Sequence, residues 1–126
     1  MRDIRHYDVF KLADALVLRV YELAASFPKY ESYGLTSQMR RSAYSIPMNL
    51  VEGAARTGSR EFAQFVNVTI GSCEEVRYQL HLAQALRYLT PAQQQDLDSE
   101  YEKVKQMLSK LLGTLGSDAP RHHRSS

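Results

Sequence analysis

Two runs of polar side chains have the composition and spacing of a functional site, and each contains a carboxylate. The first lies within the stretch LTSQMRRSAYSIPMNLVEG, residues 35–53, at steps of three, four and three. Its members are Ser42, Ser45, Asn49 and Glu52. The second repeats at three and four and comprises Ser72, Glu75 and Gln79. Because side chains three and four residues apart share a helical face, each run predicts a polar stripe along a helix.

Two glutamates on facing helices could bind a metal ion or transfer protons. A di-metal helix bundle places Glu-x-x-His on two helices and a glutamate on each of the others. Here Tyr78 stands three residues before His81, so this spacing is absent. We therefore predict no catalytic residues, no metal and no cofactor. We predict instead that the two stripes form a structural hydrogen-bond network between two helices, in which both glutamates, Asn49 and Ser72 are largely buried.

A second candidate site is a set of arginines in the first half of the chain, which could contact phosphates. They are Arg40, Arg41, Arg56 and Arg60. The alternative is an ordinary solvated surface, or ion pairs with Glu61 and aspartates. The formal net charge of +2 over 126 residues is too small to indicate a nucleic-acid-binding protein by itself. Base stacking is not expected, because Arg56 and Arg60 are not interleaved with aromatic residues.

Four helices must position these residues. The apolar pattern predicts helices over residues 8–27, 36–53, 59–87 and 91–115. Pro28 should end the first helix, and Thr36 and Ser59 are the expected N-caps of the second and third. Pro47 lies inside the second helix, but the apolar pattern resumes after it, so we expect this helix to continue. Thr90-Pro91 is a strong start signal for the fourth.

Short connections between such helices predict an all-α, antiparallel up-down-up-down four-helix bundle over residues 1–117. Residues 118–126 form a polar, basic stretch, which we expect to be a disordered tail. Cys73 is the single cysteine, so no internal disulfide can form, and its apolar helical position predicts a core residue. Neither a signal peptide nor a membrane span is evident, which predicts a cytoplasmic protein without a membrane partner.

Several motifs resemble a known bacterial family. The segment FPKYESYGLTSQMRRSAYSIP resembles the family's entry into the second helix, and Asn49-Leu50-Val51-Glu52-Gly53 resembles its Asn-(apolar)-x-Glu-Gly signature. Ser59-x-Glu61-Phe62-x-x-Phe65 and Gly71-Ser72-x-x-Glu75-x-x-x-Gln79-Leu80 resemble its third-helix signature. The family consists of four-helix bundle proteins encoded in intervening sequences of 23S rRNA genes. The resemblance covers residues 27–89, with Cys73 standing where a larger apolar residue is usual.

The resemblance implies an antiparallel bundle that assembles into rings of five. A distantly similar group, the accessory variability determinant proteins of diversity-generating retroelements, forms basic rings that contact nucleic acid. We therefore expect a non-enzymatic homo-oligomer, most often a pentamer, that binds RNA or another nucleic acid through its arginines. The alternative is a scaffold that binds a protein partner and no nucleic acid. Val68, Ile70 and Tyr78 lie off the main apolar stripe of the third helix and could be buried against a neighbouring copy.

Overall fold

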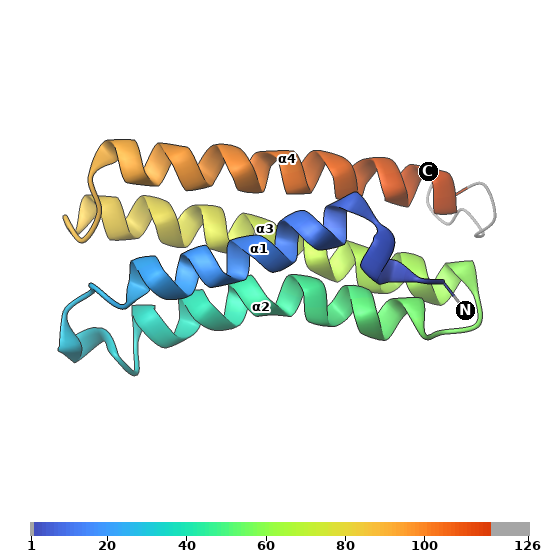
Figure 1. Ribbon diagram of the computed structural model, residues 1–126, viewed down its shortest axis with the longest axis horizontal. Helices are drawn as coiled ribbons and strands as arrows, with labels where there is room; N and C mark the ends of the chain where they lie inside the picture. The colour runs from blue at the N-terminus through green and yellow to red at the C-terminus, as the bar shows by residue number, and fades with distance from the viewer. Residues whose placement is uncertain (1, 117–126) are drawn as a thin grey trace, which may run out of the picture.

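The computed structural model describes residues 2–116, which form four α-helices and two short 3-10 helices. In chain order they are η1 (Ile4–His6), α1 (Asp8–Ala24), η2 (Lys29–Glu31), α2 (Leu35–Ala54), α3 (Ser59–Ala85) and α4 (Pro91–Leu115). Each α-helix packs against the next in sequence, and α1 also contacts α4 (Figure 1). The predicted all-α up-down bundle is therefore confirmed. The predicted disordered tail, 118–126, lies outside the described residues.

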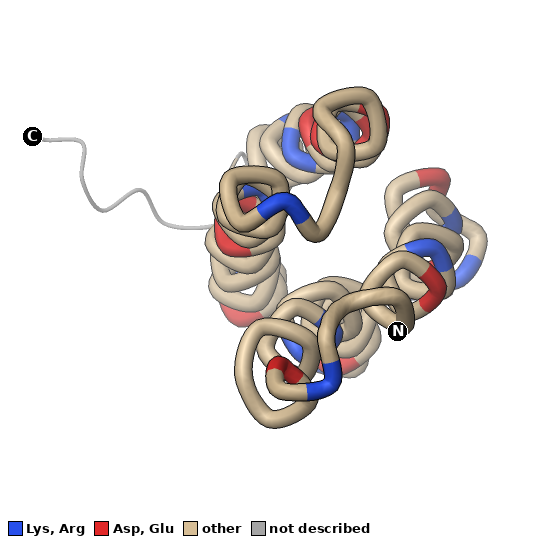
Figure 2. The backbone as a smooth tube through the Cα atoms, turned by 90° about the vertical axis from the view of Figure 1, so that its left-hand side faces the viewer, with Lys and Arg blue, Asp and Glu red and all other residues tan. Residues whose placement is uncertain are grey.

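One apolar core runs along the middle of the bundle, because every helix turns an apolar stripe inward. The largest fully buried side chains include Leu16 on α1, Met39 and Ile46 on α2, Phe62 on α3 and Tyr101 on α4. Complete burial of such apolar side chains contributes about 1.5–3 kcal/mol each relative to exposure. Seen along its axis, the bundle surrounds this core with four helices, and basic and acidic residues occur on all of them (Figure 2).

The start of α2 differs from the prediction. Thr36 is not the N-cap but is buried inside the helix, which begins at Leu35 with Gly34 before it. The backbone N–H of Leu35 is instead satisfied by the side chain of Glu31, whose Oε1 accepts it at 2.9 Å. A carboxylate from the preceding turn thus replaces the expected threonine as the acceptor for an N–H at the helix start.

Among the other helix ends, the start of α4 matches the prediction, whereas the end of α1, the cap of α3 and the end of α3, at Ala85 rather than residue 87, do not. α1 ends at Ala24, three residues before the predicted Phe27, and the chain then continues in tighter turns. α3 begins at Ser59 with Gly58 as its N-cap, so Ser59 is not the cap. At α4 the predicted cap is confirmed: the N–H of Gln93 donates to the Thr90 hydroxyl at 3.1 Å, and the Gln93 side chain accepts the Thr90 N–H at 2.9 Å.

The contact between α2 and α3 depends on one glycine. α2 continues past Pro47, as predicted, and ends at Ala54. Gly53 is therefore a residue of the last turn rather than the terminator. A Cβ atom built on Gly53 would lie 2.6 Å from the Cβ of Phe65 and 3.0 Å from Cδ1 of Phe62. Its lack of a side chain therefore lets the two helices approach closely at this point.

Within residues 2–116, none of the helices combines the length and the apolar character needed to cross a bilayer. Both ends of the described chain lie at the end of the bundle that also holds the α2–α3 loop, and the N-terminal segment runs beside the end of α2 (Figure 1). This juxtaposition brings residues from three parts of the chain to one end of the molecule.

Candidate functional site

Small polar side chains form a hydrogen-bonded seam between α2 and α3. Ser45 Oγ donates to Ser72 Oγ at 2.7 Å, and Gln79 Nε2 donates to Ser42 Oγ at 3.0 Å. Ser42 Oγ lies 3.0 Å from the carbonyl oxygen of Gln38 in its own helix. The same hydroxyl is 3.5 Å from Glu75 Oε1, at the outer limit of a hydrogen bond. One hydroxyl–hydroxyl bond and one amide–hydroxyl bond therefore tie the two helices together near the middle of the bundle.

Three residues of the predicted network lie elsewhere. Glu52 and Glu75 are exposed, so the prediction that both are buried is wrong. Asn49 is half-buried and donates to the carbonyl of Ser45 at 2.7 Å, within its own helix rather than across to α3. On α2 only Ser42 and Ser45, in the first half of the stripe, bond across to α3, whereas Asn49 and Glu52 in the second half do not. The physical reason is that the spacing of a stripe places its residues on one side of a helix but does not fix how that helix is turned toward its neighbour.

The two glutamates are also far apart. Glu75 is level with Ser42, and Ser42 precedes Glu52 by ten residues on α2, which corresponds to about 15 Å along the helix axis. Glu52 lies 3.9 Å from Arg56, with both side chains about half exposed. The two carboxylates therefore cannot act on one metal ion or one substrate atom. No three His, Cys, Asp or Glu residues are grouped as metal ligands in the part of the chain that the structure describes.

Cys73 lies in the core, where burial raises the pKa of its thiol to about 12. The thiol is therefore protonated at neutral pH and lacks the thiolate character that a nucleophile needs.

The four predicted arginines fall into two pairs at opposite ends of α2. Arg41 and Arg56 are fifteen residues apart, or about 22 Å along a helix. Arg40 lies over the ring of Tyr21 at 4.7 Å, and its Nη2 donates to the Tyr21 carbonyl at 3.1 Å. Arg40 thus links α2 to α1, whereas Arg41 is exposed.

Arg56 and Arg60 are joined at the α2–α3 loop by two arginines from the N-terminus. The guanidinium of Arg2 lies 4.6 Å from the centre of the Phe62 ring, and its Nη2 donates to Ser59 Oγ at 2.8 Å. Arg56 lies over Phe65 at 5.0 Å. Arg5 shares a surface hollow with Arg2 beside the end of α2. We call Arg2, Arg5, Arg56 and Arg60 the loop-end arginines.

Sequence reasoning missed Arg2 and Arg5, because their proximity to the loop follows from the path of the N-terminal segment. Three carboxylates belong to the same segments: Asp3, Glu52 and Glu61. Asp3 lies 2.8 Å from Nδ1 of His6, and Glu52 makes only the 3.9 Å contact with Arg56. Within residues 2–116, Arg2, Arg5 and Arg60 form no ion pair.

Some basic residues elsewhere in the bundle form ion pairs that join two helices. Arg77 on α3 bonds Asp98 on α4 at 2.9 Å and also bonds Glu102, one turn further along α4. Lys105 binds Glu74 at 2.9 Å, and its hydrogen bond holds the pKa of Glu74 below its usual value. The hydrogen bond to Asp98 raises the pKa of Arg77 in turn. This cluster ties α3 to α4 and leaves little uncompensated charge there.

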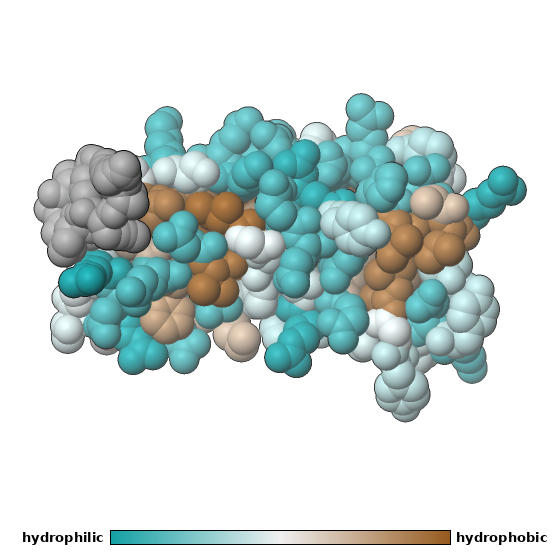
Figure 3. Space-filling model, turned by 180° about the vertical axis from the view of Figure 1, so that it is seen from behind, coloured by the Kyte–Doolittle hydropathy of each residue, from teal (hydrophilic) through white to brown (hydrophobic). Residues whose placement is uncertain are grey.

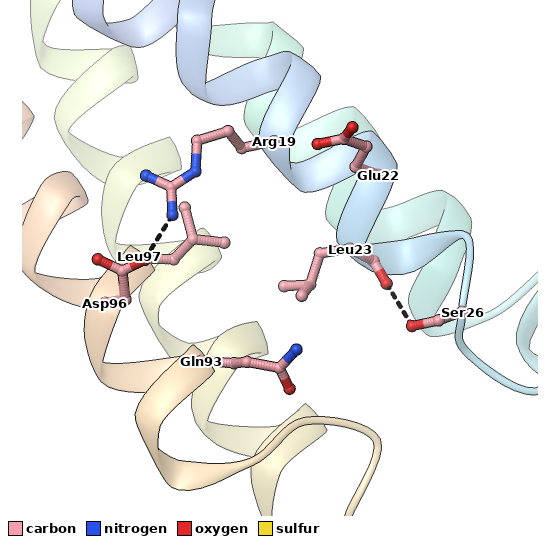
Figure 4. A pocket seen from close by; sticks show the side chains of 7 residues that line it. All are labelled: Arg19, Glu22, Leu23, Ser26, Gln93, Asp96 and Leu97. Atoms are coloured by element: carbon pink, nitrogen blue, oxygen red, sulfur yellow. Dashed lines mark hydrogen bonds and ion pairs between the residues drawn. The ribbon is translucent and has the colours of Figure 1, made fainter.

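A polar hollow of about 440 Å³ separates α1 from α4 (Figure 4). Arg19 reaches across it to Asp96, with Nη2 2.6 Å from Oδ2. Glu22, Ser26 and Gln93 line the rest with Leu23 and Leu97. The arginine is already paired, so the hollow offers no free basic group to an anionic ligand, and the ion pair joins the first and last helices.

Comparison with known proteins supports the fold and the family. A family model described as "23S rRNA-intervening sequence protein" matches residues 5–110. Among solved structures, a protein of unknown function from the S23 ribosomal protein family of Bacteroides thetaiotaomicron VPI-5482 superposes with a TM-score of 0.78 and 19% sequence identity. The match covers 83% of this chain and 95% of that one. Curated proteins give no significant match.

The structural likeness, at this level of identity, concerns the fold. The family assignment rests on the sequence match, which includes all of α1, α2 and α3, most of α4, and both polar stripes. The resemblance drawn from the motifs of the second and third helices is thereby confirmed. This chain belongs to the 23S rRNA-intervening sequence protein family.

Proposed function

We propose that this protein is a non-enzymatic, homo-oligomeric RNA-binding module of the cytoplasm, which contacts phosphates through the loop-end arginines. The observation that carries this proposal is that four arginines from two distant parts of the chain gather at one end of the bundle. Within residues 2–116, three of the four have no ion-pair partner, and Arg56 makes only the 3.9 Å contact with Glu52. Uncompensated guanidinium groups gathered at one end of a protein attract phosphates.

The way two of these arginines are held also suits phosphate binding. The flat guanidinium groups of Arg2 and Arg56 lie over the rings of Phe62 and Phe65, which restricts their motion. Stacking leaves N–H groups at the edge of the guanidinium, and two parallel N–H donors match two phosphate oxygens. The phenylalanine rings are covered by the arginines and by helix packing, so base stacking on them is not part of the proposal.

Oligomerisation strengthens this proposal. A chain of net charge +2 gives a pentamer of about +10, which increases the attraction of RNA and brings several arginine clusters together. The pentameric state comes from the family resemblance. Phosphate contacts carry little sequence information, so we expect weak binding with little sequence preference.

RNA titrations at low and moderate salt test the proposal, with the Arg56→Ala/Arg60→Ala double variant beside wild type. The variant should bind several-fold more weakly, and its dependence on log salt should be shallower by about 1.4, the value for two lost contacts to a single strand. Lys29→Ala is the control, because Lys29 is an exposed basic residue on η2, at the end of the bundle opposite the α2–α3 loop (Figure 1). Equal binding by all three proteins, or no binding at low salt, would refute the proposal.

A second candidate is a scaffold that binds a protein partner without nucleic acid. The observation in its favour is an exposed apolar groove between α2 and α3, to which Tyr78 and Leu86 contribute side chains that are 63% and 47% exposed. The dependence of binding affinity on salt concentration distinguishes the two functions, because phosphate binding weakens steeply as salt increases and apolar binding does not.

A further inference from the structure

The groove between the start of α2 and the C-terminal half of α3 combines an apolar floor with acidic edges. Leu35, Tyr78, Leu82 and Leu86 supply the apolar surface, and Glu31 and Glu75 are among the carboxylates that line it. Its volume is about 710 Å³. The face seen in Figure 3 carries an apolar area at the end of the molecule where α3 finishes and α2 begins. We call this region the acidic groove.

A second unpartnered apolar surface lies on the outer side of α2. Arg41, Tyr44, Met48 and Val51 follow one another at steps of three, four and three, so they share a helical face. The last three are 37%, 52% and 39% exposed, which is unusual for apolar residues placed in one row. From Leu35 to Val51, α2 carries two arginines and no acidic residue. We call these four residues the basic stripe.

We propose that the acidic groove of one copy receives the basic stripe of the next copy. This inference rests on the homo-oligomer of the proposed function and specifies how it is built. Charge complementarity selects the arrangement: Arg41 of one copy would face carboxylates such as Glu75 of its neighbour, while Tyr44 and Met48 would cover exposed apolar surface. A contact of groove with groove would instead bring two sets of carboxylates into one interface.

The two surfaces can be used at the same time. The two surfaces share no residue, and Val51 of the stripe borders the hollow beside the N-terminal segment, whereas the groove is lined from the α3 side by Tyr78 and Leu82. One copy can therefore offer its groove to one neighbour and its stripe to another. A head-to-tail contact of this kind gives a ring when its rotation closes, as the proposed oligomer requires. Tyr78 and Val68, expected from the sequence to be covered by a neighbour, are exposed in the single chain at 63% and 53%.

Light scattering on two single variants and their mixture tests the inference. Met48→Lys damages the stripe and leaves the groove, and Leu86→Lys damages the groove and leaves the stripe. Both side chains are about half exposed, so the variants should fold, as circular dichroism would verify. Wild type should be larger than a dimer, and each variant alone should be a monomer. An equimolar mixture should form a dimer and nothing larger, because only one intact groove and one intact stripe can meet.

Leu18→Lys is the matched control, since Leu18 is 70% exposed on α1 and belongs to neither surface. It should leave the assembly unchanged. A wild-type oligomer that persists in both variants, a mixture that stays monomeric, or dissociation by Leu18→Lys would overturn this interface and leave the oligomer and RNA binding standing. A monomeric wild type would overturn the oligomer itself. The Arg56→Ala/Arg60→Ala variant should form an oligomer of the same size as wild type. A loss of RNA binding can therefore be distinguished from a loss of assembly.

Discussion

Replacing Gly53 by alanine should destabilise the bundle, although the same change usually stabilises a helix. The substituted Cβ would lie 2.6 Å from Phe65 Cβ and 3.0 Å from Phe62 Cδ1. Phe65 Cβ is attached directly to the α3 backbone, so it cannot swing away as the end of a long side chain can. Relief requires α2 and α3 to separate by roughly 1 Å at this point, because carbon atoms prefer contacts of about 3.5–4.0 Å.

Two opposing terms set the magnitude. Alanine is favoured over glycine inside a helix by about 1 kcal/mol. Overpacking a close-packed contact costs about 1–3 kcal/mol, and sometimes more. The added Cβ would contact both Phe65 Cβ, which is bonded to the backbone, and the ring of Phe62. We therefore place the cost of overpacking at the upper end of this range. We therefore expect a net loss of about 1–2 kcal/mol in the free energy of unfolding, or several degrees in Tm for a domain of this size.

Urea or thermal unfolding at fixed protein concentration measures this change, with two other glycines as controls. A Cβ on Gly71, inside α3, meets nothing within 4 Å, and the same holds for Gly113 in α4. Gly71→Ala should therefore be neutral or stabilising by up to about 1 kcal/mol. Because Gly71 also lines the acidic groove, Gly113→Ala provides a control outside both proposed surfaces. If Gly53→Ala proves as stable as Gly71→Ala, the close approach of α2 and α3 is not what requires a glycine.

Two further predictions concern charged contacts between elements. Arg77→Ala should lower the free energy of unfolding by about 1–2 kcal/mol, because it leaves the Asp98 and Glu102 side chains without their α3 partner. Lys103→Ala is the control: it removes an exposed ion pair within α4 and should change the free energy of unfolding by less than about 0.5 kcal/mol. The pKa of Glu31 is lowered by hydrogen bonds from the Leu35 N–H and the Tyr88 hydroxyl, so its contribution is present above its ordinary pKa of 4.5 and is lost as pH falls through the lower folded value. Thermal unfolding between pH 3 and 7 should therefore show a flatter acid limb for Glu31→Gln than for wild type, and parallel curves would contradict this reasoning.

The helices and the core were predictable because the three–four spacing of apolar residues depends on local sequence alone. Leu16, Met39, Phe62 and Leu108 are each buried where the periodicity places them. Helix ends were less predictable, because the group that satisfies a terminal N–H can come from outside the usual cap position. At α2 the acceptor is Glu31, four residues before Leu35, and a search for serine or threonine selected Thr36 instead.

The candidate site was harder to predict, because it depends on how the helices are turned toward one another. Of the four stripe residues predicted to be largely buried, Ser72 is buried and Asn49 is half-buried, whereas Glu52 and Glu75 are exposed. Predicting the Arg77 cluster would require knowing that this side of α3 packs against α4. Predicting the loop-end arginines would require knowing the path of the N-terminal segment, because that path brings Arg2 to Ser59, fifty-seven residues away in the sequence.

In the proposed ring, symmetry would connect assembly to RNA binding. Copies in a closed ring are related by rotation about one axis, so the same residue of every copy lies at the same height along that axis. The loop-end arginines of all copies would therefore lie on one circle around the axis of the proposed ring, and on one rim of the ring where the bundles run along the axis. A single cluster with Arg2 and Arg56 stacked on phenylalanine offers a few phosphate contacts and little affinity. Several clusters on one rim can bind successive phosphates of a single RNA, and linked contacts strengthen one another without any new interaction within a copy. The small net charge of the chain is therefore compatible with nucleic-acid binding, provided that the arginines are concentrated at one end and repeated around the ring.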